Sequence, residues 1–351
     1  MGKNNILALK VEFKFAEVAK HALIEKALLD TNYELKKDDA HIYFPIIDKG
    51  KFDFPNKTLK MDFESRENRG DWKTKMIAQG ILDEKQASLM VKSFDVMGDI
   101  AIIDIPNGLQ KFEKKIAATL LNLHKNLRVV AKKGSEVAGK FRVRKLQVLA
   151  GEKRTETIYR ESGCAFEIDL AKVYYSPRLS YERERIAKKV KKGEKVLALF
   201  AGAGFFPIVI CKYQPKCEIL AIELNPVAVK YMVKNVARNK MGKSIKVVLG
   251  DVKKVLGGKK YKRWATRATL PLPHSAHEFL PQILDSMKKG GIVHFYYIPK
   301  SRVEDEFEDA LSKIREICKE KKRKFRVIFK RVVKTYAPHV DEVLIHFRLL
   351  N

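Results

Sequence analysis

A glycine-containing turn after an apolar run is the feature of this sequence with the clearest chemical meaning. Residues 195–200 read Lys-Val-Leu-Ala-Leu-Phe and continue into Ala-Gly-Ala-Gly at 201–204. Glycine lets the backbone approach a ligand at the carboxyl end of a buried strand. A dinucleotide site needs a third glycine three residues after Gly204, where this chain has Pro207. The turn therefore favours a cofactor without phosphates, such as S-adenosylmethionine.

Two acidic residues follow the next two strand-like runs. Glu223 lies 21 residues after Gly202, close to the spacing of about 20 expected for an acid that binds ribose hydroxyls. Asp251 follows the run 245–249 and could accept a hydrogen bond from an adenine amino group. The alternative is that both acids only cap loops. The predicted cofactor-binding residues are Phe200, Gly202, Gly204, Phe205, Glu223, Leu224, Asn225, Asp251, Val252 and Pro271.

A carboxylate lies on the apolar face of the helix predicted before the first of these strands. Ser176 suits the N-cap of this helix and Pro177 its first position. Glu182 falls along the apolar stripe of Leu179, Ile186 and Val190. Two explanations are open, an ion pair with Arg178 at i,i+4 or a general base whose pKa rises on burial.

Pro271-Leu272-Pro273 follows the fourth strand-like run of this region, where such a fold presents its substrate. Relatives that methylate amino groups carry Asn-Pro-Pro here. Without the asparagine side chain, the turn favours a ring nitrogen or ring carbon as the acceptor, unless it is only an ordinary turn. No set of His, Cys or acidic residues has the spacing of metal ligands, so no metal is expected.

Strand-like and helical patterns alternate from residue 166 onward. The strand-like runs are 195–200, 219–223, 245–249, 267–270 and 291–298, followed by 325–333 and 342–350 with no helix between them. This order predicts an α/β, doubly wound, mostly parallel sheet with an antiparallel terminal hairpin, the class I methyltransferase fold. It forms the last of three predicted domains, 1–65, 66–165 and 166–351.

The two earlier domains read as small α/β or α+β units. The first is predicted as strand 6–13, helix 16–29 and strand 41–46, with 48–69 as a linker. The second is predicted as strands 91–96 and 100–105, helix 109–123, and strands 127–131 and 141–149. Strand alternation places Arg142 and Arg144 on one face, within a basic cluster.

Charge indicates the class of partner. Lysine and arginine total 71 against 42 acidic residues, a net charge of +29. This excess favours a nucleic acid as partner, although a lysine-rich proteome, such as that of a thermophile, would give a similar excess. The 4 cysteines form no CxxC pair and read as reduced, buried thiols. No apolar stretch approaches the ~20 residues of a membrane span, so we expect a cytoplasmic monomer.

Four segments together resemble a known family. Residues 166–183, 200–206, 223–226 and 271–280 are similar to the archaeal and eukaryotic tRNA (guanine-37-N1)-methyltransferase family, and Tyr175-Ser176-Pro177-Arg178-Leu179 is its most specific motif here. The resemblance covers nearly the whole chain. It implies one domain on the tRNA elbow, one on the anticodon arm, and a catalytic domain that holds S-adenosylmethionine bent and releases S-adenosylhomocysteine.

The resemblance also implies residue roles. Glu182 would be the general base that takes the proton from guanine N1, and Arg142 would stabilise charge on the guanine oxygen. Tyr174 would position the base, which must be splayed out of the anticodon loop, beside Pro271 and Pro273. The predicted substrate-binding residues are Arg142, Arg144, Tyr174, Ser176, Arg178 and Arg183.

The chain departs from the family pattern in places. Phe205 replaces a proline of the cofactor loop, and Pro281 falls within a helix that it is expected to kink. Three alternatives stay open: C7-methylation of 4-demethylwyosine at the same nucleotide (wyosine biosynthesis), transfer of an aminocarboxypropyl group, and a non-catalytic RNA-binding protein.

Overall fold

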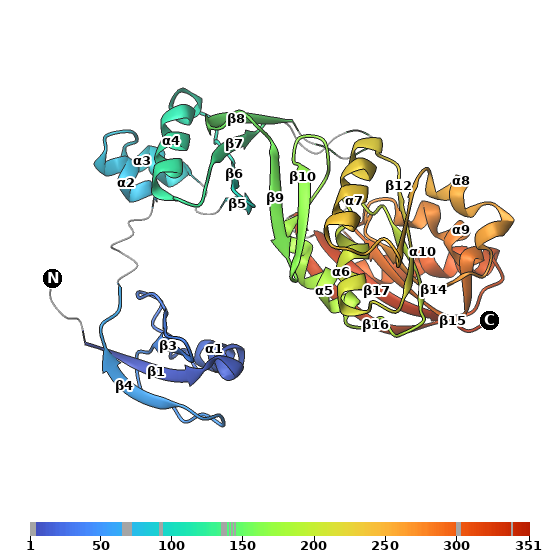
Figure 1. Cartoon of the computed structure of the whole chain (residues 1–351), viewed down its shortest axis with the longest axis horizontal. Coiled ribbons are helices and arrows are strands. Elements are labelled where there is room, and N and C mark those ends of the chain that lie inside the picture. Colours follow the sequence, from blue (N-terminus) through green and yellow to red (C-terminus); the bar gives the residue numbers. More distant parts are fainter. Residues whose placement is uncertain are drawn as a thin grey trace. The chain divides into compact units, whose positions relative to one another are not determined.

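The computed structural model describes residues 5–64, 72–90, 94–134, 139, 141, 143, 145–299, 303–337 and 340–351. The chain divides into two compact units, one of Met1–Met90 with Gly108–Thr119 and one of Val91–Asn107 with Leu120–Asn351. Figure 1 labels their elements. The domain boundaries predicted at residues 65 and 165 remain a prediction.

The first unit contains a four-stranded antiparallel sheet of order β2-β3-β1-β4. Its elements are β1 (Ile6–Glu12), α1 (Ala16–Glu25), β2 (Lys36–Lys37), β3 (His41–Pro45) and β4 (Lys57–Met61). Leu9, Leu23 and Phe44 form much of the core between α1 and the sheet.

Two predictions for this unit, the end of its helix and the extent of its linker, were wrong. The helix ends at Glu25 because Ala27 takes a left-handed conformation (φ 52°), and part of the predicted linker is the edge strand β4, which pairs with β1.

Two short helices and a longer one follow. They are α2 (Trp72–Ala78), α3 (Glu84–Leu89) and α4 (Glu113–Leu123). The helix α3 is closed by a capping box in which Asp83 and Gln86 bind each other's backbone N–H groups. The helix predicted from residue 109 starts as an α-helix only at Glu113, after a 3-10 turn at Gln110–Phe112.

The second unit begins with a small sheet of order β5-β6-β7-β8. The strands are β5 (Asp95–Met97), β6 (Ile100–Ile103), β7 (Val129–Lys133) and β8 (Leu146–Gly151). The predicted turn at Gly98-Asp99 joins β5 to β6, with Gly98 at φ +58°. An antiparallel hairpin of β9 (Glu156–Glu161) and β10 (Cys164–Asp169) follows, which the sequence patterns did not reveal.

The rest of the second unit is built on a seven-stranded sheet of order β13-β12-β11-β14-β15-β17-β16. The strands are β11 (Lys195–Leu199), β12 (Glu218–Glu223), β13 (Ile245–Leu249), β14 (Ala265–Leu270), β15 (Met287–Tyr297), β16 (Phe325–Ala337) and β17 (Val340–Leu349). The first five are parallel, and β17 and β16 are antiparallel at one edge. The predicted fold is confirmed, and the strand order reverses between β11 and β14.

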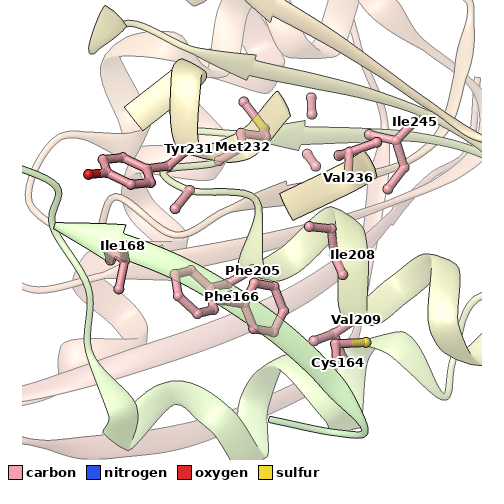
Figure 2. Packing of buried hydrophobic residues seen from close by; sticks show 14 of the residues in the cluster. Cys164, Phe166, Ile168, Phe205, Ile208, Val209, Tyr231, Met232, Val236 and Ile245 are labelled. Carbon is pink, nitrogen blue, oxygen red and sulfur yellow. The ribbon is translucent and has the colours of Figure 1, made fainter. Parts of the chain in front are cut away.

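Helices cover both faces of this sheet because its buried strands alternate their side chains (Figure 1). The helices are α5 (Ser180–Ala187), α6 (Phe205–Tyr213), α7 (Pro226–Arg238), α8 (Val252–Leu256), α9 (Leu280–Ser286) and α10 (Glu306–Glu320). Val196 and Ala198 join one core with residues of α5, α6, α7 and β10, whereas Leu197 and Leu199 join the other with residues of α8, α9 and α10. Figure 2 shows the first core, in which the Phe166 and Phe205 rings stack with centroids 4.3 Å apart.

Two predictions about helices, the start at Ser176 and the kink at Pro281, need correction. Ser176 precedes a 3-10 turn at Pro177–Leu179, makes no side-chain cap, and the α-helix begins only at Ser180. Pro281 lies in the first turn of α9, where a proline needs no N–H partner, so it does not kink the helix.

All 4 cysteines are free and buried, as expected. In the part of the chain that the structure describes, no helix is long and apolar enough to cross a membrane.

Candidate active site

A cavity of about 480 Å³ opens where β11, β12, β13 and β14 end, at the reversal of strand order where such sheets bind ligands. Most of the predicted residues line it: Phe200, Gly202, Phe205, Glu223, Leu224, Asn225, Asp251, Val252, Pro271, Pro273, Tyr174, Ser176 and Arg183. Gly204 is not part of the wall. It is the left-handed residue (φ +93°) that starts α6, and a Cβ there would come within 2.9 Å of Met232 Cγ.

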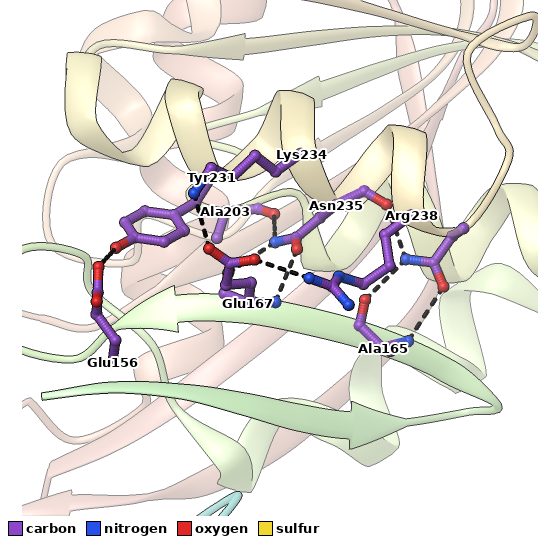
Figure 3. A network of polar contacts seen from close by, with 9 residues as sticks. Glu156, Ala165, Glu167, Ala203, Tyr231, Lys234, Asn235 and Arg238 are labelled. Carbon is purple, nitrogen blue, oxygen red and sulfur yellow. Dashed lines mark hydrogen bonds and ion pairs between the residues drawn. The ribbon is translucent and has the colours of Figure 1, made fainter.

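The cofactor loop is held in an unusual backbone conformation. Phe200 has φ 53° and Gly202 has φ +56°, and left-handed conformations of this kind are costly for a bulky residue such as phenylalanine. Asn235, fully buried on α7, donates to the Ala203 carbonyl at 2.9 Å and binds both backbone groups of Glu167 on β10 (Figure 3). The backbone of the loop is therefore held at Ala203 by a buried side chain of α7. Asn235 is a positioning residue that the sequence patterns missed.

Glu223 organises the loop through its carboxylate. Its Oε2 accepts from the Gly202 N–H at 2.8 Å, and its Oε1 accepts from the N–H groups of Leu224 and Asn225 at 2.8 and 2.7 Å. A carboxylate offers about four acceptor positions, so one remains on Oε2 for a ligand hydroxyl. Burial raises the pKa of Glu223, although these backbone donors oppose the shift.

These contacts fit an adenosine ligand and disfavour a phosphate. The Gly202 N–H, which could have cradled a phosphate, already binds Glu223, and an anionic carboxylate lines the cavity. Asp251 accepts from the Lys253 N–H at 2.7 Å as the N-cap of α8 and also lines the cavity. Capping and ligand binding are therefore compatible for both acids. Asn225 caps α7, with Pro226 at its first position, as predicted.

Replacing Glu223 should weaken cofactor binding. In Glu223→Gln an amide N–H₂ faces backbone N–H donors, and we expect S-adenosylmethionine affinity, measured by calorimetry, to fall roughly 10- to 100-fold. Glu218→Gln is the matched control, because Glu218 lies at the exposed opposite end of the same strand, β12. Equal affinities of the two variants for S-adenosylmethionine would exclude Glu223 as a cofactor-binding residue.

The wall at Tyr174 and Ser176 rests on a buried ion pair. The Arg183 Nε and Nη2 groups donate to the two oxygens of Glu161 at 2.6 and 2.5 Å, and Arg183 also donates to the Ser176 carbonyl at 3.2 Å. Both side chains are almost fully buried. Arg183 is therefore a wall residue whose guanidinium is already bound to Glu161 and which anchors the neighbouring backbone at Ser176.

The other predicted substrate residues are distributed differently. Arg178 does not line the cavity; its exposed guanidinium pairs with Asp95 at 3.3 Å. Arg142 and Arg144 lie outside the described residues. Their neighbours Gly139 and Phe141 line the cavity.

Glu182 is only 2% exposed and does not line the cavity. The ion pair with Arg178, one of the two explanations left open, is not present, because Glu182 instead binds Arg185 on its own helix at 2.8 Å and Arg331 on β16 at 3.0 Å. Arg185 lies three residues after Glu182, whereas Arg178 lies four residues before it. Its role as general base remains a prediction.

Comparison with known proteins decides the family. A family model described as the TRM5/TYW2 methyltransferase domain matches residues 157–328, after a TYW2 N-terminal domain at 74–155 and a tRNA methyltransferase 5 N-terminal domain at 8–51. The tRNA (guanine(37)-N(1))-methyltransferase Trm5b of Pyrococcus abyssi is 34% identical over 348 residues, which cover 98% of this chain and 99% of that protein. This chain belongs to the tRNA (guanine-37-N1)-methyltransferase family.

Two further members are informative. A solved structure described as the complex of aTrm5 and tRNALeu shares 32% identity and a TM-score of 0.68, covering 98% of this chain and 100% of its own. The tRNA (guanine(37)-N(1))/4-demethylwyosine(37)-methyltransferase Taw22 of Nanoarchaeum equitans is 42% identical over 160 residues, 45% of this chain and 52% of that protein. The predicted family and the use of S-adenosylmethionine by a methyltransferase domain are confirmed. The expected absence of a metal stays a prediction.

The terminal hairpin contributes wall residues that the motifs did not indicate. Lys334 and Tyr336 of β16 and Glu342 of β17 line the cavity, and Lys334 pairs with the buried Glu342 at 3.3 Å. The Tyr336 ring meets that of His274 edge-on, with centroids 5.0 Å apart. The spacing of Lys334 and Tyr336 places both on one strand face, a signal that was present but unassigned.

A buried basic cluster lies behind Glu182. Arg185 contacts His346 at 3.2 Å, the rings of His346 and His294 are 4.1 Å apart, and Arg267 contacts His294 at 2.8 Å. Burial, reinforced by the surrounding cations, lowers the pKa of His346 to about 3 and that of His294 well below its usual value. Both imidazoles are therefore neutral in the folded protein.

This cluster predicts an acid-sensitive fold. Unfolding lets His346 regain its ordinary pKa of 6.5, so the stability it contributes is present above pH 6.5 and is lost as pH falls toward 3. Each such histidine makes the free energy of unfolding fall by up to about 1.4 kcal/mol per pH unit in this window. His346→Gln should flatten the decline between pH 6.5 and 5 in chemical denaturation, and an unchanged slope would contradict the assignment.

Proposed function

We propose that this protein transfers the methyl group of S-adenosylmethionine to N1 of guanosine 37 in tRNA. One observation supports the proposal: a single cavity is lined by Glu223 and Asp251, the proposed adenosine-binding residues, and by Tyr174, Pro271 and Pro273. A cofactor and an aromatic base can therefore meet inside it. When bound, S-adenosylmethionine supplies a methyl group on positively charged sulfur that a ring nitrogen can take.

The turn at residues 270–273 has one backbone carbonyl without a hydrogen-bond donor among the described residues. The carbonyls of Leu270, Leu272 and Pro273 accept from Leu272, Ser275 and Ile298, respectively, at 2.9 to 3.1 Å. The Pro271 carbonyl accepts from no described residue. A single carbonyl can orient one N–H edge of guanine, and prolines at both ends keep the turn stiff.

Methylation at N1 requires loss of the N1 proton. Glu182 is the proposed acceptor of that proton, lying one helical turn from the wall residue Leu179. Negative charge then spreads to the guanine oxygen, which Arg142 is proposed to stabilise. Tyr174 is 37% exposed at the cavity, which suits a stacking partner for a base taken out of its loop.

The net charge of +29 supports tRNA as the partner. We propose that residues 1–65 contact the elbow, that residues 66–165 grip the anticodon arm, and that the protein acts as a monomer in the cytoplasm. C7-methylation of 4-demethylwyosine at the same nucleotide is the second candidate, favoured by the similarity to the relative whose name includes both reactions.

Methyl incorporation into two tRNA transcripts that differ only at position 37 tests the proposal. Guanosine offers an N1 proton and a neighbouring oxygen, whereas adenosine offers neither. We expect incorporation from labelled S-adenosylmethionine with guanosine 37 only. Equal incorporation into both transcripts would place the reaction at another nucleotide.

A further inference from the structure

The carboxylate of Glu182 is fully engaged in the structure. Its Oε1 lies 3.0 Å from Arg331 Nη1 in an ion pair. Arg185 Nε donates to both oxygens at 3.2 Å, and Arg185 Nη2 donates to Oε2 at 2.8 Å. A carboxylate bound by two guanidinium groups and kept out of the cavity wall cannot reach a guanine. One of these contacts must break before Glu182 can act.

The two arginines differ in how firmly they are held. Arg185 is 12% exposed, contacts His346, and stacks over the Phe329 ring at 5.0 Å. Arg331 is 32% exposed and lies on the edge strand β16, whose register shifts just beyond it, between Val332 and Lys334. Arg331 is therefore the partner that can leave.

The surroundings of Arg331 suit a phosphate. Its guanidinium lies 5.4 Å from the ring centre of Tyr181, which is 62% exposed, and Lys334, three residues later, lines the cavity. Arginine binds a phosphate with the same fork of donors that it offers to a carboxylate. An RNA phosphate beside the exposed Tyr181 ring would thus compete directly with Glu182 for Arg331.

We propose that Arg331 is a latch: in the free protein it holds Glu182 back, and a backbone phosphate of the bound RNA next to the target nucleotide draws Arg331 away and releases the carboxylate. The inference rests on the proposed function, in which Glu182 is the base. It makes the chemical step depend on correct docking of the RNA, so that a guanine without its flanking phosphates is a poor substrate.

Neutral methylphosphonate linkages, placed one at a time around guanosine 37, test the latch. At saturating tRNA, one of them should slow single-turnover methyl transfer by wild-type protein about tenfold, the scale of one charge-assisted hydrogen bond. Arg331→Gln should transfer methyl to unmodified tRNA and be insensitive to that linkage. Arg331→Lys should keep the sensitivity, as should the matched control Arg315→Gln, whose guanidinium pairs with Glu308 on the exposed face of α10.

Each other outcome overturns the latch. If no neutral linkage slows the wild-type protein at saturation, no phosphate triggers the release. If Arg331→Gln is slowed equally, the phosphate acts elsewhere. If Arg331→Gln binds cofactor but has lost turnover on unmodified tRNA, Arg331 assists Glu182 instead of restraining it. Failure of the proposed function is distinct, because wild-type protein would then give no N1-methylguanosine from unmodified tRNA.

Discussion

Glu182→Gln is expected to lower the single-turnover rate of methyl transfer by about 10²- to 10⁴-fold, the usual contribution of a general base. The amide keeps the shape of the side chain but cannot take the N1 proton. Affinity for S-adenosylmethionine should stay within about twofold, because Glu182 does not line the cavity. Rapid-quench kinetics at saturating tRNA, together with calorimetry of cofactor binding, measure both.

Glu184→Gln is the matched control. Glu184 lies on the same helix and also has a basic partner, Lys188, but its side chain is 36% exposed and accepts a hydrogen bond from the Tyr213 hydroxyl. Its replacement should leave the rate unchanged. A Glu182→Gln protein that binds cofactor normally and turns over near the wild-type rate would exclude Glu182 as the base.

Arg183→Met is expected to lower the free energy of unfolding by about 3–5 kcal/mol, because it leaves the Glu161 carboxylate buried without its charged partner. The loop at Tyr175 and Ser176 would lose its anchor as well, so cofactor and tRNA binding should weaken together. Chemical denaturation of the wild-type protein and the Arg183→Met variant measures the change in the free energy of unfolding.

The same substitution at Arg178 provides the comparison. Arg178 is five residues earlier in the chain and pairs with Asp95, but its side chain is 68% exposed, and exposed ion pairs contribute about 0–1 kcal/mol. Arg178→Met should therefore be nearly neutral. Similar losses in the two variants would mean that the Arg183–Glu161 pair does not support this wall.

The cofactor half of the site was predictable because its signals are local. The glycine turn, the acid at the end of β12 and the Asn-Pro helix start each lie within a few residues of one strand end. The alternation of strand-like and helical segments predicted the fold. Parallel strands then bring these ends together at one edge without further information. This is why Glu223, Asn225 and Asp251, which were chosen from their spacing, line one cavity.

The substrate half was less predictable because its contacts join distant segments. Glu182 contacts Arg331, which lies 149 residues later in the chain. Arg183 contacts Glu161, which lies on a hairpin whose strands carry mixed polar and apolar residues. Local periodicity offered Arg178 as the partner of Glu182, but the structure pairs Glu182 with Arg185, three residues along the same helix, and with the distant Arg331. Edge strands such as β4 escaped detection for a related reason, because partial exposure leaves them rich in lysine.

The most direct test of the central claim is the identity of the product nucleoside. A tRNA transcript with guanosine 37 is incubated with the protein and labelled S-adenosylmethionine, digested to nucleosides, and analysed by mass spectrometry, in parallel with tRNA that carries 4-demethylwyosine. We predict N1-methylguanosine from the first substrate, and a methylated product from the second only if the protein also acts on carbon 7. The absence of N1-methylguanosine, from protein shown to bind S-adenosylmethionine, would contradict the account.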